Sequence, residues 1–411
     1  MATEQVTIPT ARGHQLAGSL EMPTGLVRGA ALFAHCFTCT RQSRAAVEVA
    51  RALARHGIAT LRFDFTGLGS SGGEFGRAGF AADIEDLVES AGYLADRFGD
   101  GLLLVGHSLG GAAVLAAAAM IGRERIAAVA TIGAPSRVAH VLGAIRGDLA
   151  AIERDGHGSV TIGGRPFEIS RGFLEATRDA DLLGDVARLK RPLMICHSPT
   201  DHIVGIENAA ALFDAAQHPK SFLSLADADH LLTRAEDAVF VARMIASWAH
   251  RYLPLQQDWP MPVVGVVAIT GHGRFGTEIH TRSHRLLIDE PVSVGGDDAG
   301  PTPYDLLAGA LAGCTAMTMR LHAERKGWPL AGARVAVRHA RNHAPHGEEA
   351  ANPDGAHGLE ALYRTIELIG PDLDEEQRAA ILATADKCPV HRTLASELHI
   401  HAGGQQAFDE E

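Results

Sequence analysis

Short, almost continuously apolar runs alternate with amphipathic segments along roughly the first 250 residues of the chain. Segments 44–57 and 80–99 place apolar residues at helical spacing, and each ends at a glycine, which helix C-termini favour. The apolar runs are short and bounded by turn residues, and they predict strands near residues 29–37, 58–65, 102–108, 127–135, 191–199 and 221–230. Strands and helices that alternate in this way form a mostly parallel sheet with helices on both faces, so we expect an α/β domain.

One connection interrupts the alternation. About fifty residues, 136–189, separate two of these strands, which is long for a simple loop and predicts an inserted helical cap. Phe167, Phe173 and Leu174 lie within this cap and are expected to line the pocket or the core, with the core preferred. Further on, RYLPLQQDWPMPVVG holds three prolines and two glutamines without periodicity, as linkers do. The predicted organisation is an α/β domain over 1–252, a linker over 253–264 and a second domain over 265–411.

The second domain has a different order of elements. Three short strands precede a long apolar helix over 303–327, and two longer strands precede a second helix over 373–388. Strands that are grouped, rather than alternating with helices, are typical of an α+β fold. The strands are expected near residues 263–270, 275–281, 284–289, 333–340, 359–369 and 397–402.

Composition and charge indicate which kinds of partner and cofactor the protein is expected to bind. With 46% hydrophobic and 21% charged residues, the chain has the composition of a globular protein. Its formal charge of −12 argues against nucleic acid or a membrane surface as partner, because both attract basic proteins. The first residues show no leader pattern and five cysteines are too few for a disulfide scaffold, so we expect a cytoplasmic location with mostly reduced thiols. The 22 histidines are scattered, and no metal or other cofactor is expected.

The segment Gly106-His107-Ser108-Leu109-Gly110 contains a candidate nucleophile. It follows an apolar strand and opens an alanine-rich helix, which is where a sharp turn exposes the hydroxyl of a catalytic serine. Glycines two residues before and after the serine relieve the crowding that such a turn creates. A serine nucleophile also needs a base and an acid that orients the base.

Asp201 and His230 occupy positions suited to these two roles. Asp201 follows the strand in LMICHSP, at the carboxyl edge where sites of α/β sheets lie, and His230 follows the last strand, in LADADHLLT. Taken alone, Asp201 is equally consistent with a turn or helix cap, and His230 with a solvated loop histidine. The serine motif favours the catalytic interpretation of both. His107 is expected to pack, and Asp229 to form a turn.

With GHSLGG, SPTDHIV and DADH in this order, the first 250 or so residues resemble the α/β-hydrolase fold. The resemblance implies Ser108 as nucleophile, His230 as general base and Asp201 as the acid that orients the base. The reaction it implies is acyl transfer to water from an ester or a related small-molecule acyl substrate.

The resemblance also implies an oxyanion hole. One backbone amide is that of Leu109, directly after the nucleophile. The other is that of Phe37, because His35-Cys36 stands where the fold usually has His-Gly. Asp64, in RFDFTGLGSSGG, is expected to tie backbone and to take no part in the chemistry.

The C-terminal segments GPTPYDLLAGALAGCTAMT and CPVHRTL together resemble the osmotically induced/organic hydroperoxide resistance (OsmC/Ohr) family, over about residues 265–405. The resemblance implies Cys314 as the peroxidatic thiol, which attacks an organic hydroperoxide. It implies Cys388 as the resolving thiol, which then closes a disulfide. It also implies a homodimer formed through this domain. Taken singly, each cysteine is well explained as a small buried residue, because free cysteine is among the residue types most often buried.

Groups that support the thiolate are also implied. Family peroxidases carry a glutamate ten residues before the first cysteine, where this chain has Tyr304, and Asp305 follows it. The arginine that lowers the thiol pKa is expected from HTRSHRLLIDEP, as Arg285 in preference to Arg282.

Three functional interpretations follow. In the first, a carboxylesterase-like serine hydrolase is fused to a thiol peroxidase that uses organic hydroperoxides and a dithiol reductant. In the second, only the hydrolase is catalytic and the OsmC-like domain serves dimerisation and substrate shaping, which the departure at Tyr304 favours. The third is metal or dithiol chemistry at Cys36 and Cys39, in HCFTCT. It is the weakest, because zinc sites usually take four ligands and the chain has no second C-x-x-C pair.

Overall fold

The computed structural model describes residues 2–36, 39–75, 79–162, 164–254, 265–341 and 360–401. Contacts divide the chain into two compact units. Unit 1 comprises Met1–Leu287 and Gly295–Ala299, and unit 2 comprises Ile288–Val294 and Gly300–Glu411.

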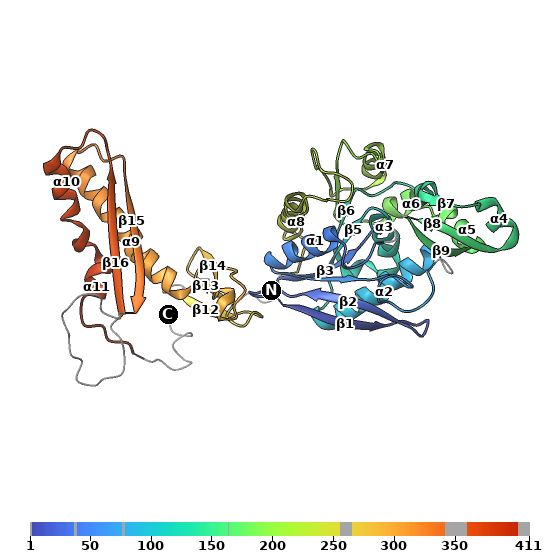
Figure 1. Ribbon diagram of the computed structural model, residues 1–411, viewed down its shortest axis with the longest axis horizontal. Helices are drawn as coiled ribbons and strands as arrows, with labels where there is room; N and C mark the ends of the chain where they lie inside the picture. The colour runs from blue at the N-terminus through green and yellow to red at the C-terminus, as the bar shows by residue number, and fades with distance from the viewer. Residues whose placement is uncertain are drawn as a thin grey trace. The chain divides into compact units, whose positions relative to one another are not determined.

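Unit 1 is built on an eight-stranded sheet of order β1-β2-β4-β3-β5-β6-β10-β11 (Figure 1). The strands are β1 (Thr3–Pro9), β2 (Gln15–Glu21), β3 (Gly29–Ala34), β4 (Ile58–Phe63), β5 (Leu102–His107), β6 (Ile126–Ile132), β10 (Leu193–His197) and β11 (Lys220–Ser224). The β1–β2 and β2–β4 pairs are antiparallel, and all other neighbours are parallel. The predicted mostly parallel sheet is therefore confirmed, with the β1–β2 hairpin as an addition.

Helices cover both faces of this sheet (Figure 1). Ala31 and Phe33 of β3 enter the core under α1 (Arg44–Arg55) and α8 (Ala235–Ala249). The alternate residues Leu32 and Ala34 enter the core under α2 (Gly79–Phe98) and α3 (Leu109–Ile121). Because both faces are buried, every residue of β3, β4 and β5 is buried, which explains why these strands are apolar runs without alternation. The remaining elements on this unit include α7 (Glu207–Ala215) and the short η1 (Arg123–Arg125).

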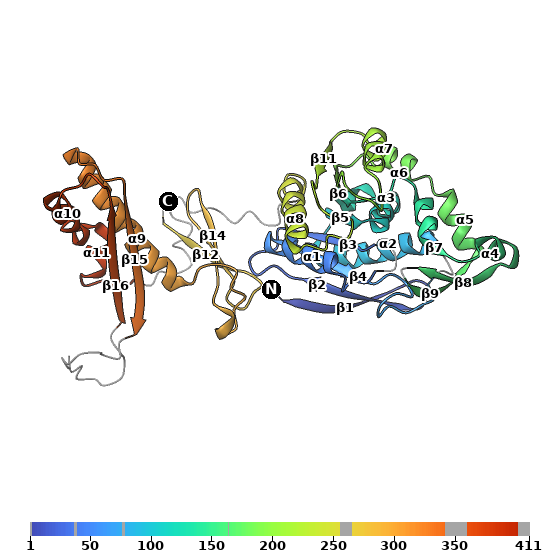
Figure 2. The same cartoon turned by 45° about the horizontal axis from the view of Figure 1, so that its top comes forward.

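The cap lies where the sequence predicts it but is not purely helical (Figure 2). Its members are η2 (Val138–Ala144), β7 (Ile145–Arg146), α4 (Leu149–Asp155), β8 (His157–Ile162), β9 (Arg165–Ser170), α5 (Arg171–Asp179) and α6 (Leu182–Arg188). β7, β8 and β9 form an antiparallel sheet. Phe173 and Leu174 are buried in the small core of the cap as predicted, and Phe167 packs against that core half-buried.

A three-stranded sheet follows the linker region: β12 (Val267–Thr270), β13 (Thr277–His280) and β14 (Arg285–Ile288). Contacts group residues 265–287 with unit 1, whereas the sequence-based boundary places them in the second domain. The physical reason is hydrogen bonding: the amides of His272 and Gly273 donate to the carbonyls of Gly25 and Thr24. The carboxylate of Glu278 in addition accepts from the guanidinium of Arg28.

In unit 2 the long helix α9 (Pro303–Lys326) lies on the antiparallel pair β15 (Gly332–Arg341) and β16 (Glu360–Ile369), with α10 (Glu375–Leu382) and α11 (Pro389–Leu394) beside it (Figure 2). Two 3-10 turns, η3 (Val292–Val294) and η4 (Ala385–Lys387), complete the unit. The strand predicted over 397–402 is wrong as far as the structure describes it, because residues 397–401 pair with no strand. Among the helices of the described residues, none combines the length and apolar composition needed to cross a bilayer.

Candidate active site

Ser108 lies at a sharp turn between β5 and α3. Its backbone has φ 55° and ψ −123°, a conformation that residues other than glycine rarely adopt. A Cβ on Gly106 would lie 2.3 Å from the carbonyl oxygen of Gly110, and a Cβ on Gly110 would lie 2.4 Å from that of Ala34. The two glycines of the motif are therefore needed for strand and helix to meet at this turn, as the sequence predicts.

The three residues predicted as a triad are hydrogen-bonded to one another. Nε2 of His230 lies 2.9 Å from Oγ of Ser108, and Nδ1 of His230 lies 2.7 Å from Oδ2 of Asp201. All three come from chain segments at the carboxyl ends of strands β5, β10 and β11. The distances allow a proton to pass from the serine hydroxyl to Nε2 while the carboxylate holds Nδ1–H.

The carboxylate of Asp201 is held in its ionised form. Burial alone raises its pKa, but hydrogen bonds outweigh burial and leave the pKa below the usual range. The donors are Nδ1–H of His230 and the amides of Val204 and Ile203, the last two at 2.9 Å and 2.8 Å from Oδ1. An ionised acid in this place stabilises the imidazolium that forms when His230 takes a proton.

Two further histidines hold the loops that carry the triad. Nε2–H of His107 donates to the carbonyl of His230 at 2.7 Å, and Nε2–H of His197 donates to the carbonyl of Val204 at 2.8 Å. Burial lowers the pKa of His107 to about 4, so the ring is neutral near pH 7. The sequence predicts only packing for His107. The hydrogen bond depends on a tertiary contact 123 residues away, which the sequence does not reveal.

Gly133, at the end of β6, is a second residue that sequence analysis missed. It has φ +57°, and a Cβ there would lie 3.3 Å from Nδ1 of His230 and 3.4 Å from Oδ2 of Asp201. The missing side chain leaves room for the hydrogen bond between His230 and Asp201.

Of the predicted oxyanion hole, the structure describes one member. Leu109 is the first residue of α3, where backbone amides have no acceptor within the helix and an anion is stabilised. Phe37 lies outside the described residues. Just before it, Nδ1–H of His35 donates to the carbonyl of Cys36 at 2.8 Å and helps to fix that end of the loop.

Cys36 and Cys39 form a disulfide, which corrects the expectation that these thiols are reduced. The amide of Cys39 donates to the carbonyl of Cys36 at 3.1 Å, and this turn brings the two Cα atoms to 5.3 Å, within the range that a disulfide spans. The nearest following helix, α1, begins only at Arg44, so Cys36 lacks the helix N-terminus that activates redox dithiols. In the described residues, no group of three or more His, Cys, Asp or Glu is arranged to hold a metal ion.

The interpretation of Asp64 as a structural residue is confirmed. Its two carboxylate oxygens accept from the backbone amides of Arg41 at 2.6 Å and Ser70 at 2.9 Å, and from the guanidinium of Arg41. It thereby joins the loop after β3 to the loop after β4.

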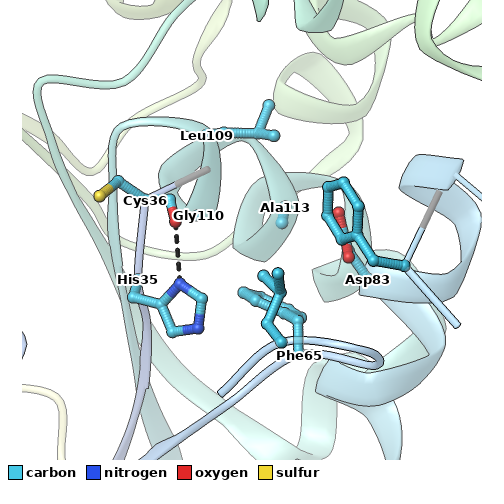
Figure 3. A pocket seen from close by; sticks show the side chains of 9 residues that line it. His35, Cys36, Phe65, Asp83, Leu109, Gly110 and Ala113 are labelled. Carbon is cyan, nitrogen blue, oxygen red and sulfur yellow. Dashed lines mark hydrogen bonds between the residues drawn. The ribbon is translucent and has the colours of Figure 1, made fainter. Parts of the chain in front are cut away.

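A small cavity is lined in part by residues that directly follow Ser108 on α3 (Figure 3). Leu109, Gly110 and Ala113 of α3 form one wall, and His35 and Cys36 form another. Its other lining residues are Phe65, Leu68, Phe75 and Asp83. The ring of Phe75 also packs on cap residues Phe167 and Phe173, with centroid distances of 4.6 Å and 6.3 Å, so the cap contributes to closing the cavity.

In unit 2 the two predicted redox cysteines are neighbours. Cys314 lies on α9, and Cys388 is the N-cap of α11, where its sulfur accepts from the amide of His391 at 3.2 Å. The sulfur of Cys388 also lies 3.7 Å from Oγ1 of Thr315 and within hydrogen-bond reach of the Cys314 thiol. Both thiols are free.

The pKa of Cys388 is lower than usual. Burial raises it, but the His391 amide, the Thr315 hydroxyl, the Cys314 thiol and the charge of Arg364 together lower it by more. Arg364 projects from β16, and its Nη1 donates to Oγ1 of Thr315 at 3.2 Å and to the carbonyl of Ala385 at 3.1 Å. The sequence did not identify this arginine, because it comes from a distant strand.

The residues predicted to support the thiolate have other contacts. Asp305 forms a capping box with Thr302 at the start of α9, and hydrogen bonds from the amide and hydroxyl of Thr302 lower its pKa. Tyr304 stacks on His339 with ring centroids 4.1 Å apart. Arg285 groups with unit 1, where its Nε lies 3.9 Å from Glu278, and its role toward the thiols stays a prediction.

Comparison with known proteins agrees with this division. The family model of serine aminopeptidase, S33, matches residues 27–153, and that of OsmC-like protein matches residues 295–402. The esterase domain of a Rhodothermus marinus protein is 47% identical with a TM-score of 0.51, over 61% of this chain and 99% of that domain. The α/β hydrolase GrgF from Penicillium sp. sh18 is 20% identical with a TM-score of 0.52, over 62% of this chain and 99% of GrgF, and shares the fold.

A curated relative is more distant. The uncharacterized protein YfhR of Escherichia coli O157:H7 is 25% identical over 169 residues, which are 41% of this chain and 52% of YfhR. The chain thus spans about half the length of the curated relatives it matches.

The fold, the nucleophile turn and the similarity to the Rhodothermus marinus domain show that the chain belongs to the α/β hydrolases. Its C-terminal part is an OsmC-like domain. The protein is thus an α/β hydrolase fused to an OsmC-like domain.

Proposed function

We propose that unit 1 is a carboxylesterase-like serine hydrolase acting on a small ester or related acyl substrate. His230 takes the proton of Ser108 as the serine oxygen attacks the acyl carbonyl. The amide of Leu109, with that of Phe37 as second donor, stabilises the oxyanion that forms. His230 then protonates the leaving group, and a water molecule activated by the same imidazole releases the acid.

One observation carries this proposal: a single imidazole lies 2.9 Å from the Ser108 hydroxyl and 2.7 Å from the Asp201 carboxylate. The test is labelling with a fluorophosphonate, which reacts with activated serines, followed by peptide mass analysis. We expect the label on Ser108 and its loss in His230→Gln. Labelling that persists in His230→Gln, or that goes to another serine, contradicts the proposal. A series of esters and thioesters of increasing acyl length then defines the substrate class.

A second activity is proposed for unit 2, because two free thiols lie together beside Arg364. In this reaction the Cys314 thiolate attacks an organic hydroperoxide, releasing the alcohol and leaving a sulfenic acid. The Cys388 thiol condenses with the sulfenic acid to give a disulfide and water, and an external dithiol, as the cytoplasm would supply, reduces the disulfide. The pKa of Cys388 is lowered, so trapping the first sulfenic acid with dimedone and mapping it distinguishes attack by Cys314 from attack by Cys388.

The test is one equivalent of cumene hydroperoxide followed by intact mass and peptide mapping. A disulfide between Cys314 and Cys388 that is absent in Cys314→Ser supports the peroxidase. Thiols that stay reduced support the alternative, in which the OsmC-like domain is a module for dimerisation and substrate shaping.

The homodimer is proposed on the surface of α9. This helix buries only Leu311, Thr315, Met319 and Ala323, whereas its residues Met317 and Leu321 are 67% and 50% exposed. An apolar helix face of this kind fits a second copy of the same domain. Sedimentation of the protein and of Met317→Glu tests this: a dimer that dissociates in the variant is expected, and a wild-type monomer contradicts it.

A further inference from the structure

The cavity beside the nucleophile is apolar except for two groups. Five of its lining residues are Phe65, Leu68, Phe75, Leu109 and Ala113. The two polar side chains are Asp83, on α2, and His35, and they lie on opposite sides of the cavity (Figure 3). Leu109 and Gly110, one and two residues after Ser108, both line the cavity, which makes it a candidate site for the acyl group of a substrate attacked at Ser108.

The carboxyl of Asp83 has no hydrogen-bond partner among the described residues. Its neighbour Asp86, one turn further along α2, is by contrast bonded to Thr66 and Arg12. Burial, followed by the charge of Asp86, raises the pKa of Asp83 well above its usual value. Asp83 is half-buried, and a carboxyl that lines an apolar cavity without a protein partner is available for a hydrogen bond to a bound ligand.

His35 supplies a second unsatisfied group. The residue is 2% exposed, and because its Nδ1–H donates to the Cys36 carbonyl, its Nε2 carries a lone pair. Nε2 has no partner within the described part of the chain. Burial lowers the pKa of His35, so that this nitrogen remains an acceptor near neutral pH.

A hydroxyl group fits these two partners better than other simple polar groups. It donates and accepts, so it pairs with a carboxyl in either protonation state, and it also donates to a bare imidazole nitrogen. An ammonium group pairs well only with the ionised carboxyl, and a ketone only with the protonated one. An unsubstituted acyl chain leaves both polar groups without partners.

We propose that Asp83 is the specificity residue for acyl groups that carry a hydroxyl close to the ester carbonyl. The inference rests on the hydrolase function proposed above and names its substrate class: short hydroxyacyl esters. Asp83 binds the hydroxyl, the phenylalanine side chains surround the carbon chain, and His35 faces the same group from across the cavity.

The test compares kcat/KM for the para-nitrophenyl esters of butyrate, β-hydroxybutyrate and β-aminobutyrate. In the wild-type protein the hydroxy ester is expected to be preferred over butyrate by about tenfold, the equivalent of one well-made hydrogen bond. Asp83→Leu is expected to remove this preference and Asp83→Asn to reduce it, because an amide still donates and accepts. Glu85→Gln, which makes the same change of charge on an exposed site of the same helix, is the matched control and keeps the full preference.

The ratio between esters separates this inference from the proposed function. A wild-type protein that hydrolyses butyrate through Ser108 without preferring the hydroxy ester overturns the inference and leaves the hydrolase standing. A stronger preference for the amino ester, or a preference unchanged in both Asp83 variants, overturns it as well. If Asp83→Leu does not fold, the ratio of kcat/KM for the hydroxy ester to that for butyrate is measured in Asp83→Asn, and an unchanged ratio there overturns the inference. No hydrolysis of any ester together with no labelling of Ser108 overturns the proposed function and the inference with it.

Discussion

Nε2 of His107 lies 2.7 Å from the carbonyl oxygen of His230, so the residue before Ser108, the proposed nucleophile, holds the backbone of His230, the proposed base. The two rings are 5.4 Å apart. This hydrogen bond fixes the position of the His230 loop relative to Ser108. It joins the His107 side chain to a backbone carbonyl, and neither group takes part in the proposed proton transfer.

His107→Leu removes the donor and leaves the His230 carbonyl without its partner, at a cost of about 1 kcal/mol. We expect kcat for ester hydrolysis to fall by about tenfold with little change in KM. In His107→Gln the side-chain amide keeps a donor, and most of the activity should return. Equal losses in the two variants would mean that only ring packing matters at this position.

The same histidine makes stability depend on pH. Burial lowers its pKa from the ordinary 6.5 to about 4, so below about pH 6.5 the unfolded chain binds a proton that the folded protein does not. The resulting stability is complete above the unfolded-state pKa and is lost as pH falls toward about 4, by about 1.4 kcal/mol per pH unit. His107→Gln lacks this dependence. Urea unfolding of both proteins at about pH 7.5 and about pH 5 should show their stability difference shifting against the wild type at the lower pH; a constant difference contradicts it.

Gly133→Ala should impair catalysis beyond its effect on folding. The positive φ of 57° costs about 1 kcal/mol for alanine, and the added methyl group meets Nδ1 of His230 at 3.3 Å and Oδ2 of Asp201 at 3.4 Å. We expect a fall of about tenfold in kcat, because the pair must move apart. Gly13→Ala is the control, since it has φ +83° with nothing within 4 Å of its new methyl group. Both variants should lose stability, and only Gly133→Ala should lose kcat; a comparable loss in Gly13→Ala would assign the effect to strain alone.

Arg364→Gln should make the thiol pair less reactive. The positive charge of Arg364 is one of the causes that lower the pKa of Cys388, so its removal should raise that pKa. The rate of alkylation of Cys388 by iodoacetamide, followed by peptide mass across a pH series, measures this, and the midpoint should move to higher pH. Arg334→Gln, at an arginine that is 75% exposed and paired with Glu367, should leave the midpoint in place. A midpoint that moves in neither variant rules out Arg364 as the thiol's cation.

The sequence predicts those parts of the fold whose burial can be read from one continuous segment of the chain. β3, β4 and β5 are buried on both faces, so they are mostly apolar without alternation and are easily recognised. β1 was missed because only Ile8 of its residues is fully buried, which leaves too little contrast in the pattern. The nucleophile turn is predictable because its glycines and serine are neighbours in sequence.

What the sequence could not reveal depends on contacts between distant segments. Arg364 reaches the thiol pair from a strand 49 residues away from Thr315, its hydrogen-bond partner. The sequence does carry a signal for Asp83, because it lies three residues after Phe80 and four before Leu87. Both of these are buried, so an acid lies on the same face of the helix as core residues. The disulfide between Cys36 and Cys39 follows from a local turn, which composition and compartment arguments do not describe.

The central claim is that Ser108 is the nucleophile of an ester hydrolase, and the rate of hydrolysis of a short para-nitrophenyl ester by Ser108→Ala tests it most directly. The control is Ser136→Ala, at a buried serine whose amide and hydroxyl both donate to Oδ1 of Asn208. We expect Ser108→Ala to lose at least about a thousandfold in kcat while thermal unfolding stays unchanged, and Ser136→Ala to remain active. Hydrolysis by Ser108→Ala at the wild-type rate would contradict the account.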